Sequence, residues 1–257
     1  MSYSSLLLQN ITKADLRTEP FAYAVKDQTL DETFYQDLLK EYPDVKELAE
    51  VSKKGHPSRL SLGFEDPTTK QFLKKSPSWS QFMASISSRQ YLEELLDLFQ
   101  EPLAELYPQM LNRRSRLVKK GTNRLTRFLQ SRLPSFHNSL YMEGNFNLSG
   151  DGYEVGPHRD KLGKLFVGLI YFRTKQDSTG GEFLVLKEKS PSDYFFNRNV
   201  DEVDERLEIV ETIPFAPNHF CVMLNTKRSL HAVTRYHANG EGRRFVYVDI
   251  GTNYPLF

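Results

Sequence analysis

Two histidines and an aspartate have the types and spacing of metal ligands. His158 and Asp160 flank Arg159. On a β-strand, side chains at positions i and i+2 share a face, so this imidazole and this carboxylate would project together, with Arg159 pointing away. A second imidazole is available from His231, far along the chain. Two imidazoles and one carboxylate on one face of an octahedral ion leave three coordination positions open for other ligands.

The region that carries these residues is patterned as short β-strands. From about residue 136, runs rich in β-branched and aromatic residues alternate with turn residues, as is typical of a sandwich or barrel. The predicted strands lie near residues 137–142, 153–160, 164–173, 181–187, 206–213, 219–224, 229–235 and 243–250. Eight strands suit a jelly roll, in which two sheets pack face to face. His158 and Asp160 would then lie on one strand and His231 on another.

The N-terminal half is patterned as helices. Thr29 and Glu32 have the spacing of a capping box ahead of apolar residues at helical intervals. Asp66-Pro67 resembles an N-cap followed by proline at the first helical position. Another helix is predicted to begin at Pro77, and a third one carries an apolar face that starts at Tyr91.

These patterns predict a mainly β protein with helices and a simple domain organisation. The stretch 21–25 alternates as a strand does, whereas 51–66, with two glycines and a proline, reads as a loop. We expect a single domain over residues 1–257. Within it, residues 1–134 would form a mostly helical supporting region and residues 135–257 the β-rich core.

Composition excludes several classes of protein. A hydrophobic content of 39% and a charged content of 26% are those of a soluble globular protein. The net charge of +1 argues against a protein built to coat nucleic acid. Cys221 is the single cysteine, which excludes an internal disulfide and suits a reducing compartment. No apolar run approaches the ~18 residues of a membrane span. We therefore expect a cytoplasmic protein with no membrane partner.

Two polar stretches leave their roles open. Residues 112–132 hold eight Lys and Arg and no acid, which is typical of a solvated face but also suits contact with an anionic substrate or partner. Residues 189–205 are polar and acidic with embedded aromatics, and are too long for a tight turn. They would form either a cover over a site or a disordered insertion.

Further motifs accompany the metal-binding pattern. Gly180-Gly181-Glu182-Phe183 follows a predicted strand, Pro217-Asn218 enters another, and Gly242-x-Arg244-aromatic follows His231. Over roughly residues 141–250 the chain thus resembles the Fe(II)/2-oxoglutarate-dependent dioxygenases of the prolyl-hydroxylase-like branch. The resemblance implies a double-stranded β-helix that uses Fe(II), 2-oxoglutarate and O₂ and releases succinate and CO₂, with ascorbate as a candidate reductant.

The resemblance also assigns roles to individual residues. The two histidines and the aspartate named above look like the iron ligands. Arg244 looks like the anchor for the distal carboxylate of 2-oxoglutarate, since a guanidinium matches a carboxylate with two hydrogen bonds. Arg243 is its rival, because apolar residues alternate on both faces of that strand. Tyr141 is a candidate second contact to 2-oxoglutarate.

The function expected from the resemblance is hydroxylation of an unactivated C–H bond in a small molecule or an amino-acid side chain. A jelly-roll protein that binds without turnover is one alternative. An oxygenase that acts on nucleic acid is another, with residues 112–132 as its track, although the near-neutral charge counts against it.

Overall fold

The computed structural model describes residues 5–44, 58–111, 116–117, 139–174, 179–190, 205–239 and 242–257. The basic stretch 112–132 lies outside the described residues except for the backbone of 116–117, and the predicted cover 189–205 lies outside them except at its two ends. No described helix is long and apolar enough to cross a membrane.

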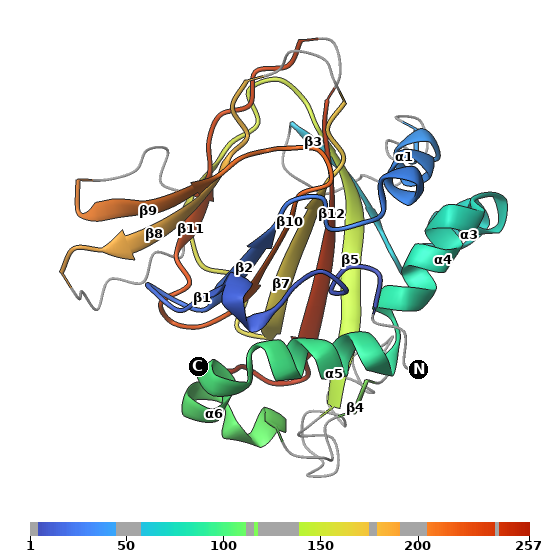
Figure 1. The fold of residues 1–257 in the computed structure, drawn as a ribbon. Coiled ribbons are helices and arrows are strands. Elements are labelled where there is room, and N and C mark those ends of the chain that lie inside the picture. The colour runs from blue at the N-terminus through green and yellow to red at the C-terminus, as the bar shows by residue number, and fades with distance from the viewer. Residues whose placement is uncertain are drawn as a thin grey trace.

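Two β-sheets dominate the described part of the chain (Figure 1). The larger sheet contains β1 (Leu16–Arg17), β2 (Tyr23–Lys26), β3 (Arg59–Gly63), β4 (Arg116–Leu117), β5 (Ser139–Ser149), β7 (Lys164–Tyr171), β10 (Phe220–Leu224) and β12 (Arg243–Thr252). Its order is β1-β2-β10-β7-β12-β5-β3, with β4 paired to β5. The smaller sheet contains β6 (Val155–His158), β8 (Phe183–Glu188), β9 (Leu207–Ile213) and β11 (His231–Val233), in the order β6-β11-β8-β9. The protein is thus mainly β, and the strand pairs that build both sheets are antiparallel apart from β4 with β5.

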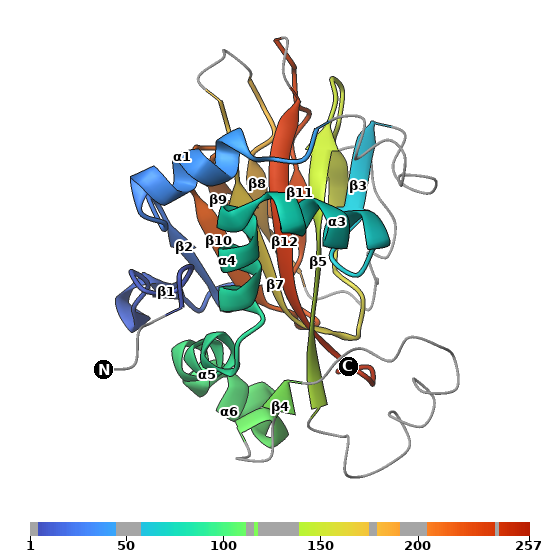
Figure 2. The same cartoon turned by 90° about the vertical axis from the view of Figure 1, so that its right-hand side faces the viewer.

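Helices from the first half of the chain cover one face of the larger sheet. They are α1 (Glu32–Lys40), α3 (Pro67–Lys75), α4 (Pro77–Ile86), α5 (Arg89–Leu98) and α6 (Gln100–Leu106), with short 3-10 helices at Lys13–Asp15 and Pro108–Leu111. In Figure 2, α1, α3 and α4 lie in front of the larger sheet, and β8, β9 and β11 lie behind it. The larger sheet is therefore the middle layer of three.

The alternation of side chains along each strand gives this middle layer two buried faces. On β12, Val246, Val248 and Ile250 belong to the core that the helices cover. Phe245 and its neighbour Tyr171 on β7 belong to a second core, toward the smaller sheet. Because both faces are buried, the apolar pattern of β12 does not reveal which face a given side chain occupies.

The eight predicted strands of the C-terminal region correspond to β5 through β12, and the predicted strand 21–25 overlaps β2. The helix starts at Pro67 and Pro77 are also confirmed, with Asp66 Oδ1 accepting a hydrogen bond from the Thr68 N–H at 2.8 Å. The prediction that 51–66 is loop throughout is wrong, because β3 lies within it.

The predicted capping box at Thr29 is also wrong. Asp31 caps α1, and its Oδ1 accepts from the Phe34 N–H at 3.1 Å. The Thr29 hydroxyl is buried and donates to the Leu7 carbonyl at 2.8 Å. Its hydrogen bond therefore joins two segments of the N-terminal region and leaves the helix end to Asp31.

Candidate metal centre

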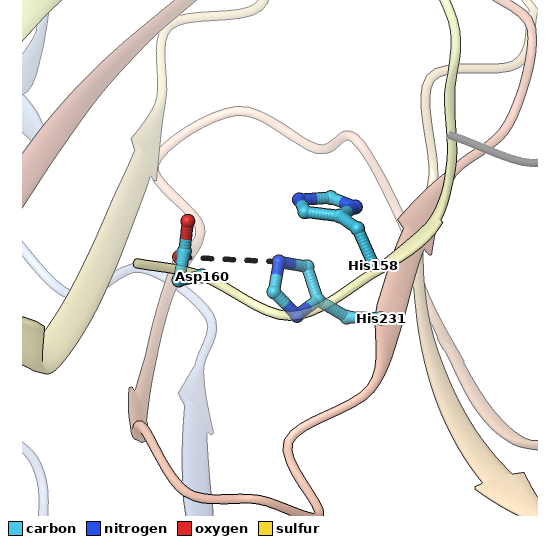
Figure 3. Close-up of side chains that lie close together, drawn as sticks. All are labelled: His158, Asp160 and His231. Atoms are coloured by element: carbon cyan, nitrogen blue, oxygen red, sulfur yellow. Dashed lines mark ion pairs between the residues drawn. The ribbon is translucent and has the colours of Figure 1, made fainter. Parts of the chain in front are cut away.

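The three predicted metal-binding side chains lie together, the two histidines on the smaller sheet and Asp160 just beyond it (Figure 3). His158 ends β6 and His231 begins β11, and the two are directly paired across these strands with ring centroids 4.2 Å apart. Asp160 follows two residues after β6, and its Oδ2 is 4.0 Å from His231 Nε2. One ligand atom from each residue lies within 4.8 Å of the others, so the group could hold a metal ion. Arg159 points elsewhere, with its Nη2 3.6 Å from Glu188 Oε1.

Hydrogen bonds to the backbone orient both imidazoles for metal binding. His158 Nδ1 is 2.8 Å from the Gly156 carbonyl oxygen, and His231 Nδ1 is 2.9 Å from that of Ser229. Because a carbonyl oxygen only accepts, each Nδ1 must carry its proton and donate. Each Nε2 therefore presents its lone pair, and metal-binding histidines are commonly fixed in this way.

The surroundings of His231 keep its imidazole neutral. Its side chain is buried, and the ring of Phe183 on β8 stacks on it with centroids 5.1 Å apart and planes at 19°. Burial lowers the pKa of His231 to about 3 and nearby His158 adds to this, while Asp160 opposes it. A neutral imidazole is the form that binds a metal ion.

Lys164, which the sequence analysis did not single out, holds the carboxylate of the group. Its Nζ lies 3.5 Å from Asp160 Oδ1 and 2.7 Å from Asp249 Oδ2, so one ammonium bridges two carboxylates. Burial pushes the pKa of Asp160 upward, but Lys164 and the two imidazoles outweigh it and the pKa lies below its usual value. Asp160 is therefore ionised and ready to bind a cation.

Asp249 on β12 completes this arrangement from the larger sheet. Its Oδ1 accepts a hydrogen bond from the Gly168 N–H at 3.3 Å. Burial raises the pKa of Asp249 to about 7, and the Lys164 ammonium opposes that rise. Burial works against the charged form of Lys164 too, but Asp249 and Asp160 raise the pKa of Lys164 above its usual value. The ammonium thus stays charged between them and links Asp160 to Asp249 of the larger sheet.

The structure separates the two candidate arginines by face. Arg244 lies on the helix-covered face of β12, and its guanidinium carbon is 5.9 Å from the centre of the Tyr42 ring. Arg243 lies on the face toward the smaller sheet and is fully buried. The predicted anchor Arg244 is thus on the opposite face of β12 from the metal-binding group, and the rival Arg243 is on the facing side.

The guanidinium of Arg243 is enclosed by aromatic rings. Its central carbon lies 4.9 Å from the ring centres of Tyr171 and Phe215 and 4.4 Å from that of Phe245. Its Nε donates to the Gly181 carbonyl at 3.1 Å, while Nη1 and Nη2 have no hydrogen-bond partner among the described residues. A buried charge with two unused donors suits an anionic ligand, because leaving it unpaired is costly.

The predicted turn at Gly180-Gly181 supports this arginine. Both glycines have positive φ angles, +76° and +78°. A Cβ at Gly181 would lie 2.9 Å from both Cδ and Nε of Arg243, which is too close for unchanged packing. Gly181 is therefore required both by its backbone conformation and by the approach of Arg243.

A cavity of about 840 Å³ adjoins the metal-binding group. Its wall includes His158 and Asp160 from the smaller-sheet side and Tyr141 and Tyr247 from the larger sheet. The Tyr141 hydroxyl donates to the Thr252 carbonyl at 3.1 Å, and a Cβ at Gly251 would clash with the Tyr141 ring. Tyr141 thus lies in the wall of this cavity, as a contact to a bound molecule would require, while its role as a contact to 2-oxoglutarate stays a prediction.

Comparison with known proteins gives structural similarities only. No protein-family model and no curated protein sequence matches the chain. Similar solved structures include a prolyl 4-hydroxylase from Phytophthora capsici, with 16% identity, a TM-score of 0.48, and coverage of 98% of this chain and 67% of that one. Another is an oxidoreductase of the 2OG-Fe(II) oxygenase family from Burkholderia pseudomallei, with 10% identity, a TM-score of 0.46, and coverage of 91% and 85%.

A third similar structure is a Trichoplax adhaerens prolyl hydroxylase in complex with a peptide fragment of the hypoxia inducible factor oxygen degradation domain. It has 8% identity, a TM-score of 0.47, and coverage of 90% of this chain and 83% of that one. At such identities and TM-scores, the chemistry of this protein must be argued from its own residues.

Proposed function

We propose that this protein is an Fe(II)- and 2-oxoglutarate-dependent oxygenase with the double-stranded β-helix fold. The observation that carries the proposal is the in-register pair of His158 and His231 with Asp160 beside them. Two imidazoles and a carboxylate on one side of an ion are the ligand set of non-haem Fe(II) oxygenases. Bound there, Fe(II) would supply the redox chemistry that couples conversion of 2-oxoglutarate and O₂ to succinate and CO₂ with oxidation of a substrate.

The chain's own groups are prepared for this ion. Both Nε2 atoms are directed by hydrogen bonds at Nδ1, and Asp160 is ionised and held by Lys164. Two neutral imidazoles and one carboxylate would leave a divalent ion with a net charge of about +1. Such a centre attracts an anionic chelating ligand, which is the character of a 2-oxo acid.

Arg243 is the group that we propose as the anchor for the distal carboxylate of 2-oxoglutarate. It faces the smaller sheet, and its two terminal nitrogens lack partners among the described residues. Tyr171 beside it is buried, which raises the pKa of its hydroxyl, and the Arg243 guanidinium opposes that rise. The neutral hydroxyl and the guanidinium together offer buried donors to a carboxylate. Arg244 could bind this carboxylate only if its side chain lay on the opposite face of β12.

The primary substrate that we propose is a small molecule or an amino-acid side chain. The cavity beside His158 and Asp160, about 840 Å³, falls in the size range of small-molecule sites. Hydroxylation of an unactivated C–H bond is the reaction expected there. Ascorbate as a reductant and a cytoplasmic location stay predictions from the sequence.

The test is Fe(II)-dependent formation of succinate from 2-oxoglutarate without a primary substrate. We expect turnover in the unmodified protein, and none in His158→Ala or His231→Ala, because two remaining ligands hold Fe(II) weakly. His237→Ala is the matched control, since His237 is exposed and outside the metal-binding group. Anaerobic calorimetry with Mn(II) measures metal binding separately from activity.

Two results would contradict the proposal. Retained turnover in both ligand variants at saturating Fe(II) would refute the site. Metal binding without any succinate would refute the activity and favour a binding protein of the same fold.

A further inference from the structure

Arg59 is a second guanidinium that faces the interior between the sheets. It begins β3, the edge strand beside β5, where Leu60 and Leu62 pack toward the helices. Alternation therefore turns Arg59 and Gly63 to the other face. Both line the cavity of about 840 Å³ that also exposes His158 and Asp160. Arg59 thus shares a cavity with two of the proposed iron ligands.

The direct contacts of the Arg59 guanidinium are to tyrosine side chains. Arg59 Nη1 donates to the Tyr153 hydroxyl at 3.2 Å, and the guanidinium carbon is 5.9 Å from the centre of the Tyr153 ring. Its Nε is buried without a hydrogen-bond partner, and no carboxylate among the described residues forms an ion pair with it. A guanidinium stays protonated, so the cavity wall presents a fixed positive charge that a carboxylate would match with two hydrogen bonds.

The co-substrate does not account for this charge. Arg59 and Arg243 both pair with Ser149 of β5, one from each side, so their strands are separated by two strand spacings, or roughly 10 Å. Arg243 is enclosed by three rings, whereas Arg59 lies in the open cavity wall. Two guanidiniums that are separated in this way can each bind a different carboxylate. Since Arg243 is the proposed anchor for 2-oxoglutarate, Arg59 is available for a second carboxylate.

The cavity has room for a ligand beside Arg59. A Cβ at Gly63 would meet no atom within 4 Å, so there is open space on the same face four residues along the strand from Arg59. Glu143 and Asn145 of β5 line the same cavity and bring acceptor oxygens. A molecule with a carboxylate at one end and a donor such as an ammonium group nearby would satisfy both kinds of wall residue.

Resting on the proposed function, we infer that Arg59 binds the carboxylate of the primary substrate. The substrate class is then a small carboxylic acid, with free α-amino acids the first set to test. An internal peptide residue whose side chain has no carboxylate would not meet this requirement. Gly63 sets the space available to that molecule.

The experiment uses the twenty free L-α-amino acids, each paired with its α-carboxamide, and straight-chain carboxylates from acetate to hexanoate. Binding to the protein loaded with Mn(II) and 2-oxoglutarate is measured by anaerobic calorimetry, and stimulation of succinate formation is measured with Fe(II). We expect at least one acid to bind, with its amide at least tenfold weaker. Arg59→Met should weaken binding of that acid by about 30-fold or more. This is the lower end of the range expected when one member of a buried charge pair is truncated.

Three variants make the result specific. Arg59→Lys should retain part of the affinity for the acid, because lysine keeps the positive charge but cannot donate the two parallel hydrogen bonds of a guanidinium. Gly63→Leu should block acid binding while leaving 2-oxoglutarate binding within threefold, and it stays informative if Arg59→Met fails to fold. Arg89→Met, on the exposed side of α5, is the matched surface control and should change neither acid binding nor 2-oxoglutarate binding.

Several outcomes would overturn the inference. These are equal binding of acid and amide, no binder in the whole panel, or an unchanged acid affinity in Arg59→Met. A large loss of 2-oxoglutarate affinity in Arg59→Met would instead make Arg59 the co-substrate anchor. Absence of succinate formation in the unmodified protein would refute the proposed activity alone, because acid binding is read by calorimetry without turnover.

Discussion

Replacing Arg243 with methionine should remove the stabilisation that 2-oxoglutarate gives the metal-loaded protein. Methionine keeps an unbranched side chain among the three rings but removes the charge and the two terminal nitrogens that lack partners among the described residues. Truncating one member of a buried charge pair costs ~2–5 kcal/mol. At about 1.4 kcal/mol per tenfold, the dissociation constant of 2-oxoglutarate should rise by roughly one and a half to three and a half decades.

The assay is thermal unfolding with saturating Mn(II), which binds without turnover, at a 2-oxoglutarate concentration of 100 times the wild-type Kd. Ligand binding at that ratio stabilises the folded state by about 2.7 kcal/mol. For a chain of this size the melting temperature should rise by roughly 5–10 °C. In Arg243→Met the same concentration is at most about three times Kd, so the shift should be about 3 °C or less.

Each variant is compared with its own ligand-free state, so a change in intrinsic stability cancels. Arg244→Met is the matched control, because Arg244 lies over Tyr42 on the helix-covered face. Its 2-oxoglutarate shift should equal that of the unmodified protein. A lost shift in Arg244→Met together with a full shift in Arg243→Met would refute the assignment of faces along β12.

Four further outcomes follow from the site and the core. Lys164→Met should weaken Mn(II) binding by about 10- to 100-fold in calorimetry, because Asp160 loses its partner, and an unchanged affinity would deny Lys164 that role. Gly181→Ala should destabilise the protein by ~1–3 kcal/mol in urea unfolding, since it strains a positive φ and crowds Arg243. The unmodified protein should give no chlorinated product in chloride buffer by mass spectrometry, because the Asp160 carboxylate occupies the place that a halide would take. Burial raises the pKa of Cys221 to about 12, so iodoacetamide should label it only on unfolding, and rapid labelling of the native protein would contradict this.

The sequence predicted the β-rich region well because its strands are separated by strong turn residues. The metal-binding group was also predictable, since His158 and Asp160 are neighbours on one short segment and His231 lies in its own short strand. What could not be predicted depends on distant contacts. Lys164 acquires its role only when β12 brings Asp249 to it, and no local pattern shows that pairing.

The sequence could not decide between Arg243 and Arg244 for a different reason. Both faces of β12 are buried, so apolar residues occur on both of them. The usual alternation of polar and apolar positions, which would show the direction of each side chain, is missing. In β3 that contrast was present in Arg59-Leu60-Ser61-Leu62, but the glycines and the proline around it favoured a loop. Arg59 was therefore overlooked together with its strand.

The direct pairing of His158 with His231 ties metal binding to strand register. A shift of β11 by one residue against β6 would send the His231 imidazole to the outer face of the smaller sheet and leave two ligands for the ion. The number of Mn(II) ions bound per chain after refolding would then measure the fraction of molecules whose sheets have assembled correctly. A bound metal ion would thus report on late folding, because only chains in which β6 and β11, far apart in the sequence, are paired in the correct register would retain it.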